Sequence, residues 1–174
     1  MTLVVAVVAV VALLASYVTW TAGRLDRMHA RVDAAWAGLD GQLVRRAAAA
    51  RALLAQLPTG PARSALDAAA SAVLDAGLAG REAVENDLSR ALKAAAAMVP
   101  DHTSLGELET ASTRVGLARS FHNTAVTDTR ALRRRRLPRA LRLAGHRDLP
   151  AYFNIDDTAL PPHNSAPPRR TVPG

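Results

Sequence analysis

The chain has 174 residues, of which 38 are alanine and 23 leucine, and its 21 arginines against one lysine give a net charge of +7. Ala and Leu are the strongest helix formers, and aromatic residues make up only 3%, so the composition argues against an all-β fold. Cysteine is absent, which excludes a disulfide framework, a thiolate nucleophile and a Cys-based zinc site.

An uncharged apolar run opens the chain, from Leu3 to Trp20. As a helix it would span about 27 Å, close to the roughly 30 Å hydrocarbon core of a bilayer. Tyr17 and Trp20 stand at one end, where aromatic residues collect at membrane interfaces. A cleaved signal peptide is the alternative, but it needs a positive n-region and a shorter apolar stretch. We therefore predict an uncleaved transmembrane anchor at residues 3–22.

Three arginines follow the apolar run closely, Arg24, Arg27 and Arg31, whereas no charged side chain precedes it. Because Arg and Lys set membrane topology, this bias predicts that the N-terminus lies outside and the body of the chain lies in the cytoplasm. The heavy use of Ala, and of Arg over Lys, is typical of a GC-rich bacterium. The expected location is therefore a bacterial cell membrane.

Apolar residues recur at helical spacing in three stretches after the anchor. The first, 24–57, continues from the anchor without an intervening proline and ends at the turn 58–61. The second, 62–99, contains two glycines that predict a kink or a local weakness. The third begins with a capping box at Ser104 and is stopped by Pro138.

Three long helices joined by short loops are expected to pack as an antiparallel bundle. The predicted fold is therefore all-α: a transmembrane helix, an antiparallel bundle of three long helices over 24–137, a basic elbow with a short helix over 138–157, and an irregular Pro-rich tail over 158–174. In this arrangement the third helix leads away from the membrane and ends about 45 Å from its start. Alanines at buried positions predict close helix approach and a thin core.

The stretch RVDAAWAGLDGQLVRR at 31–46 resembles the LemA family, in which a short membrane anchor precedes V-x-x-A-W-x-x-(I/L)-D-x-Q-L-x-R-R on the first long helix. Three further matches follow in the family's order: ENDLSRAL at 85–92, ARSFHNTAV at 118–126 and the aromatic pair at 152–153. The resemblance covers residues 3–155. The chain departs from it where His122 replaces a family Tyr and where alanines replace the second half of the first helix.

This resemblance implies a membrane-anchored helical bundle with a mostly cytoplasmic body and no established catalytic activity. Some relatives are thought to work beside membrane metalloproteases. We therefore expect a scaffold or adaptor without catalysis of its own, whose partner is another envelope or membrane protein, with a membrane protease or a second copy of the chain as candidates. The alternatives are an accessory subunit of a membrane protease, and a protein that binds anionic lipid or nucleic acid through its Arg-rich C-terminal segment.

Polar residues that recur in the resemblance predict a network between the first and third helices. Its members are Asp40, Gln42, Arg45, Arg119 and Asn123. Arg119 and Asn123 are four residues apart and share one helix face. Buried polar groups must be paired and can fix the register of helices, and we prefer this role to ligand binding.

Trp36 and His122 are predicted core anchors, because both fall on the apolar stripes of their helices. The alternative for Trp36 is a binding edge formed with Asp33 and Asp40, three residues before it and four after it. The five histidines show no metal-ligand spacing, and the chain has no Gly-rich phosphate loop and no serine elbow. We therefore expect no catalytic residue, no metal site and no cofactor.

Residues 129–147 hold eight arginines and no acidic residue. The predicted basic patch consists of Arg133, Arg134, Arg135, Arg136, Arg139 and Arg142. Its candidate ligands are an acidic protein surface, anionic lipid and nucleic acid. Because we expect the patch to lie several Debye lengths from the membrane, with few aromatic residues nearby, we rank protein first, lipid second and nucleic acid last.

Overall fold

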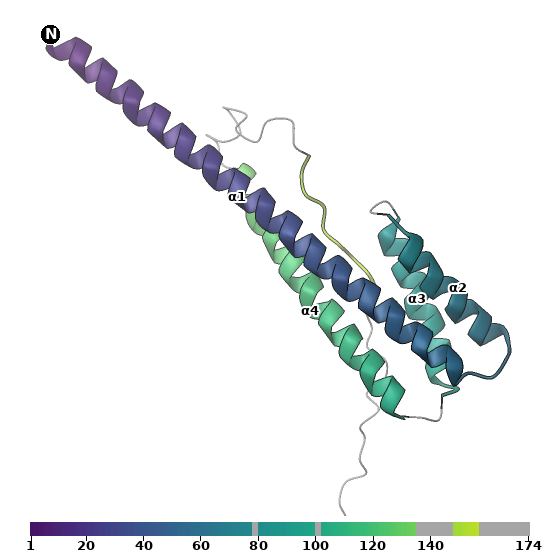
Figure 1. Ribbon diagram of the computed structural model, residues 1–174. Coiled ribbons are helices and arrows are strands. Elements are labelled where there is room, and N and C mark those ends of the chain that lie inside the picture. The colour runs from purple at the N-terminus through teal and green to yellow at the C-terminus, as the bar shows by residue number, and fades with distance from the viewer. Residues whose placement is uncertain (78–79, 100–101, 135–147, 157–174) are drawn as a thin grey trace, which may run out of the picture. The chain divides into compact units, whose positions relative to one another are not determined.

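The computed structural model describes residues 1–77, 80–99, 102–134 and 148–156, which contain only helices and irregular segments (Figure 1). In chain order the elements are α1 (Thr2–Ala52), the short 3-10 helix η1 (Leu53–Ala55), α2 (Pro61–Asp75), α3 (Arg81–Ala96) and α4 (His102–Arg133). The predicted all-α fold class is confirmed. The predicted Pro-rich tail and most of the basic elbow lie outside the described residues.

Helix α1 is one uninterrupted helix of 51 residues, which contains both the predicted anchor and most of the first predicted bundle helix. Gly23 does not break it, since a helix tolerates a single glycine at a cost of about 1 kcal/mol. The large apolar side chains near the N-terminus are exposed, and none of the most apolar window is buried inside the protein. Among the described residues, α1 is the helix that is long and apolar enough to cross a membrane.

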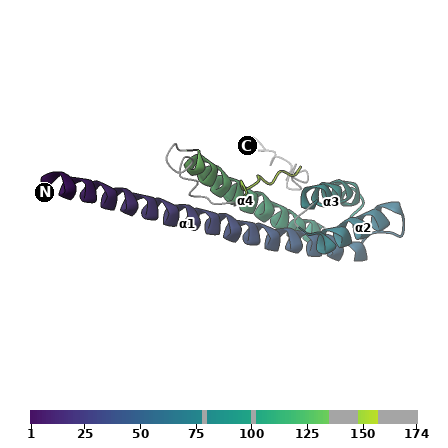
Figure 2. The same cartoon turned by 90° about the horizontal axis from the view of Figure 1, so that it is seen from above.

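The segment predicted as one long second helix forms two helices, α2 and α3, which pack side by side as a hairpin (Figure 1, Figure 2). Gly80 precedes α3 with a φ of 82°, a left-handed conformation that a side chain with a Cβ disfavours. Arg81 then donates from Nη1 to the backbone oxygens of Val73 and Ala76, at 2.8 and 2.9 Å. These bonds satisfy carbonyl groups that the end of α2 leaves unpaired. The glycines therefore mark a reversal of the chain and not a kink.

The start of α4 also differs from the prediction. The helix begins at His102, so Ser104 lies inside its first turn and is not the N-cap. A helix capped by Ser104 would begin at Leu105, so the sequence signal places the helix start three residues too late.

The chain divides into two compact units that cut across the predicted bundle of residues 24–137. Unit 1 comprises residues 1–40 and 118–153, and unit 2 comprises residues 41–117 and 154–174. Helices α1 and α4 each contribute to both units.

In unit 1, α1 and α4 run antiparallel. Thr129 donates from Oγ1 to the backbone oxygen of Met28 at 3.4 Å. Farther along α1, the ring centroid of Trp36 lies 5.5 Å from that of His122. Residue numbers therefore rise along α1 while those of the facing residues on α4 fall. The C-terminal end of α4 lies at the end of unit 1 where the apolar run of α1 stops.

This direction contradicts the expectation that the last long helix leads away from the membrane. The physical reason is the reversal at Gly80, because two short helices replace one long helix and the chain turns once more before α4 begins. From the pairing of Thr129 with Met28, the end of α4 at Arg133 is level with Arg24 on α1. We ranked lipid behind protein as the ligand of the predicted basic patch because we expected the patch to lie far from the membrane. The direction of α4 removes this reason.

Unit 2 has its own apolar core, which draws on every helix that contributes to the unit. Its buried members are Ala47, Ala50, Leu53, Leu57, Leu66, Ala70, Val73, Leu88, Leu92, Ala95, Val99, Leu105 and Leu108. Four of these are alanines with no exposed surface. Because alanine buries much less apolar area than leucine, these positions let helices approach closely but contribute little hydrophobic stabilisation.

A buried carboxylate lies within unit 2. Glu85 on α3 is fully buried, and its Oε2 accepts a hydrogen bond of 2.6 Å from Nη2 of Arg46 on α1. Its Oε1 lies 3.6 Å from Nε of Arg81, whose guanidinium also binds the end of α2. Both arginines are at most 4% exposed. Three buried charges thus connect α1, α2 and α3.

Candidate functional site

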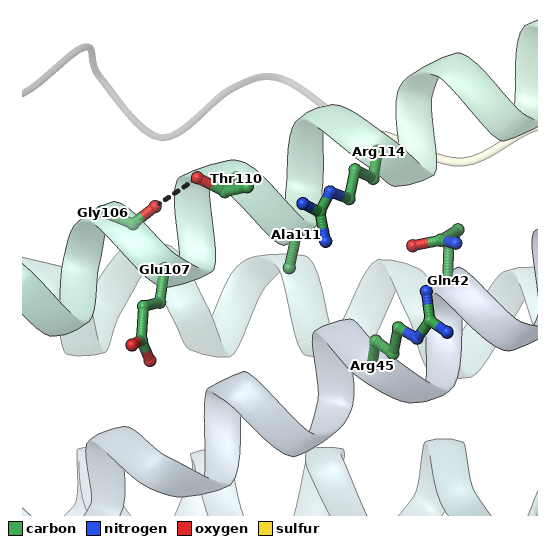
Figure 3. Close-up of a pocket in the computed structure, with 7 residues that line it drawn as sticks. All are labelled: Gln42, Arg45, Gly106, Glu107, Thr110, Ala111 and Arg114. Atoms are coloured by element: carbon green, nitrogen blue, oxygen red, sulfur yellow. Dashed lines mark hydrogen bonds between the residues drawn. The ribbon is translucent and has the colours of Figure 1, made fainter.

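Unit 2 contains a pocket of about 410 Å³, whose lining side chains are drawn in Figure 3. Its volume falls within the range of about 300–1,000 Å³ that is typical of ligand sites. The lining residues come from the part of α1 and the part of α4 that belong to unit 2, and they are Gln42, Arg45, Gly106, Glu107, Thr110, Ala111 and Arg114.

Two guanidinium groups stand on facing walls of this pocket. In Figure 3, Arg114 reaches from α4 toward α1, and Arg45 rises from α1 on the opposite side. Both residues are exposed, so an incoming group can replace the water around them. A guanidinium presents a planar fork of N–H donors that matches the two oxygens of a carboxylate. The end of the pocket between Arg45 and Arg114 is therefore suited to an anionic group.

Gln42 adds a hydrogen-bond acceptor beside Arg45 (Figure 3). Its Oε1 is buried and has no hydrogen-bond partner among the described residues. A buried polar atom without a hydrogen-bond partner destabilises a protein by about 1–3 kcal/mol. A ligand whose N–H donates to the Gln42 oxygen removes this penalty, and its removal favours binding. The pocket thus offers two cationic donors and one neutral acceptor.

Glu107 lies at the far end of the pocket, away from the two guanidinium groups in Figure 3. Between these ends, the hydroxyl of Thr110 donates to the backbone oxygen of Gly106 at 2.8 Å, a bond within its own helix. The pocket is therefore positive at one end and negative at the other. A group with an acid at one end and N–H donors at the other is electrostatically complementary to it.

The five residues of the predicted polar network are divided between the two units. Gln42 and Arg45 line the pocket of unit 2, whereas Asp40, Arg119 and Asn123 belong to unit 1. Asn123 donates from Nδ2 to the backbone oxygen of Phe153 at 3.0 Å, and its Oδ1 accepts from the Phe153 N–H at 2.9 Å. These two bonds hold the chain near Phe153 against α4. The pairing of Asp40 with Arg119 and Asn123 stays a prediction.

The predicted core anchors meet a third ring that sequence reasoning did not assign to them. Phe153 lies 5.4 Å from Trp36 and His122 lies 5.5 Å from it, between ring centroids, both in edge-on geometry. His122 and Phe153 are buried, and Trp36 is half-buried. The ring of Trp36, the alternative binding edge, is therefore covered in part by the chain's own C-terminal segment.

The segment 148–153 binds α4 through its backbone oxygens as well as through Phe153. Arg133 donates to the oxygen of Asp148 and Arg130 to that of Pro150, each at 2.7 Å. The Arg130 guanidinium also lies over the ring of Tyr152, 4.7 Å from its centroid. Arginines at the end of α4 thus have a structural role that their clustering in the sequence did not reveal.

The predicted basic patch is described only in part. Arg133 is half-buried and Arg134 is exposed. The other four members, Arg135, Arg136, Arg139 and Arg142, lie outside the described residues.

Sequence reasoning found one wall of the pocket and missed the other. Gln42 and Arg45 were singled out, but they were expected to face Arg119 and Asn123, whereas the pocket places them with residues 106–114. The cause is the direction of α4, which the unrecognised reversal at Gly80 changed.

Within the residues that the structure describes, no group of three or more His, Asp or Glu side chains could hold a metal ion. Comparison of the chain with models of protein families, with curated proteins and with solved structures finds no match. The interpretation of the site therefore depends on the geometry of its own residues.

Proposed function

We propose that this protein is a single-pass, membrane-anchored adaptor of LemA type, without catalytic activity of its own, which binds an acidic segment of another envelope or membrane protein in the pocket of unit 2. The observation that carries the proposal is that Arg45 and Arg114 face the pocket from opposite sides, next to the Oε1 of Gln42, which is buried and has no hydrogen-bond partner among the described residues.

The apolar run supports the anchor, because its side chains cover no part of the protein core and its length suits a bilayer. Arg24, Arg27 and Arg31, which follow it, support a cytoplasmic body in a bacterial cell membrane. Protease added to vesicles of known sidedness checks this orientation, since it is expected to digest the body only from the cytoplasmic face. The ordered motifs of the sequence support the LemA resemblance, with a membrane protease or a second copy of the chain as candidate partners.

An acidic peptide segment satisfies the pocket better than a simple anion does. A side-chain carboxylate can accept hydrogen bonds from Arg45 and Arg114, and a backbone N–H of the same segment can donate to Gln42. A simple anion would occupy the guanidinium groups but would leave the Gln42 oxygen without a donor. The carboxylate of Glu107 at the far end also disfavours a ligand that is anionic throughout.

We expect the double substitution Arg45→Gln and Arg114→Gln to weaken binding of a fluorescent Asp/Glu-containing peptide by about 10-fold to 100-fold. A hydrogen bond to a charged group contributes roughly 1.5–3 kcal/mol, whereas a neutral bond, which the Gln amide can still donate, contributes about 0.5–1.5 kcal/mol. Each of the two substitutions therefore costs on the order of 1 kcal/mol. The measurement is fluorescence anisotropy of the peptide, titrated with the full chain in detergent micelles.

The matched control is Arg51→Gln with Arg90→Gln, which removes the same charge from exposed sites of unit 2 outside the pocket. It is expected to retain nearly all of the affinity. Equal weakening by both double variants would show that only net charge matters, and that result would contradict the proposal.

A further inference from the structure

Arginines from both helices of unit 1 gather where α1 leaves its apolar run. Residues 20–31 and 128–134 together hold six arginines and only two aspartates. We use the name basic collar for Arg24 and Arg27 on α1 and for Arg133 and Arg134 at the end of α4. Except for Arg133, which is half-buried, these residues are exposed.

The two halves of the basic collar stand at one level along unit 1. Thr129 binds Met28, and four residues farther toward the end of α4 the antiparallel direction places Arg133 level with Arg24. Leu25 is 1% exposed and Leu132 is 6% exposed, so the apolar interior of unit 1 extends to this level. The end of α4 therefore adds its charge to that of α1 at the same height.

The basic collar follows the apolar run directly. The guanidinium of Arg24 lies over the ring of Trp20, 5.7 Å from its centroid, and Trp20 is the last residue of the run. Four residues of helix rise about 6 Å, which is less than the Debye length of about 8 Å at physiological salt. If Trp20 lies at the membrane interface, Arg24 and the end of α4 level with it stand within this distance of the lipid headgroups, and Arg27 lies one helical turn farther away.

Acidic residues near the basic collar are fewer than its arginines. Asp128 faces Arg31, outside the basic collar, at 3.9 Å between Oδ2 and Nη1. Asp26 is exposed between the two collar arginines of α1. Arg133 donates to the backbone oxygen of Asp148, a contact that fixes the position of Arg133. With Asp148 counted beside Asp26, the four arginines of the basic collar still outnumber the aspartates by two.

We propose that the basic collar binds the anionic headgroups of the membrane that α1 crosses, so that unit 1 is attached to the bilayer surface by α4 as well as by α1. The proposal rests on the membrane anchor of the proposed function and is independent of the pocket in unit 2. It is supported by two observations. Arg24 and Arg133 lie at the same height along unit 1, and arginines outnumber aspartates around them.

Electron spin resonance of headgroup-labelled lipids tests the proposal with the full chain in phosphatidylcholine vesicles that contain phosphatidylglycerol. Lipids next to a membrane protein give a motionally restricted signal, and the ratio of this signal for the two labels measures the preference for the anionic lipid. The variant is Arg24→Gln, Arg27→Gln and Arg134→Gln, which leaves the structural contact of Arg133 intact. The control is Arg51→Gln, Arg90→Gln and Lys93→Gln, with the same loss of charge at exposed sites of unit 2 outside the pocket.

The wild type is expected to prefer phosphatidylglycerol severalfold, with about fivefold per arginine as the upper limit. The collar variant is expected to lose most of this preference, and the control variant to keep it. Equal restriction of both lipids by the wild type, or equal losses in both variants, would overturn the proposal. A chain that restricts neither lipid is not inserted at all, and this outcome would refute the membrane anchor itself.

Discussion

Replacing Glu85 by alanine lowers the free energy of unfolding by about 3–5 kcal/mol, the cost of breaking a buried ion pair by removing one partner. The substitution leaves Arg46 and Arg81 buried without the carboxylate that both of them face. Such a loss is a large part of the roughly 5–15 kcal/mol that stabilises an ordinary domain. The apolar core of unit 2 offsets little of this loss, because several of its buried positions are alanines, which contribute little hydrophobic stabilisation.

Urea unfolding of the full chain in detergent micelles measures this effect. The control is Asp87→Ala, which removes an exposed carboxylate of the same helix that pairs with Arg90. It is expected to cost less than about 1 kcal/mol, as surface ion pairs do. Glu85→Gln is expected to fall between the two variants, because the amide oxygen can still accept one hydrogen bond. A Glu85→Ala variant as stable as Asp87→Ala would refute a stabilising role for the buried carboxylate.

The double substitution Val8→Arg and Val11→Arg is expected to remove the chain from the membrane. Each arginine near the centre of a transmembrane helix costs about 2.5–3.5 kcal/mol on insertion scales, so the pair costs about 5–7 kcal/mol. Both valines are about 60% exposed, so the substitution leaves the packing of both units unchanged. The measurement is the fraction of the chain that stays in membranes washed with alkaline carbonate.

Val44→Arg is the control for this experiment, because Val44 is an exposed valine of the same helix in unit 2. The Val44 variant is expected to stay in the membrane like the wild type. If the double variant also stays in the washed membranes, the apolar run is not what attaches the chain.

The sequence predicted the elements that depend on local pattern. Uninterrupted helical spacing from the apolar run into residues 24–57 indicated one continuous helix, and α1 is continuous to Ala52. The reversal at Gly80 was missed because a glycine lowers helix propensity in the same way at a kink and at a turn. What decides between them is the positive φ of Gly80 and the bonds from Arg81 to the end of α2, and these exist only once α2 and α3 have packed together.

The same limit applies to the polar residues. Arg46 stands midway between Leu39 and Leu53, seven residues from each, where the spacing calls for an apolar residue. A charge at such a position requires a buried partner, but the spacing does not identify Glu85 as that partner. Likewise Gln42 and Arg45 were recognised from the resemblance, whereas Arg114 depends on which part of α4 they face. Trp36 was recognised as an anchor, but Phe153 comes to it from a segment without helical pattern. The sequence pattern thus identified single residues of the site, but it did not identify their partners in distant segments of the chain.

Photo-cross-linking in cell membranes tests most directly the claim that the pocket of unit 2 holds an acidic segment of a protein partner. A photoreactive amino acid in place of Ala111, which lines the pocket, is expected to give one discrete protein adduct whose cross-linked peptide is acidic by mass spectrometry. The adduct is expected to disappear in the Arg45→Gln, Arg114→Gln background and not to form from Ala94, an exposed position on α3. An adduct that survives the loss of both arginines, or that forms equally from Ala94, would contradict the account.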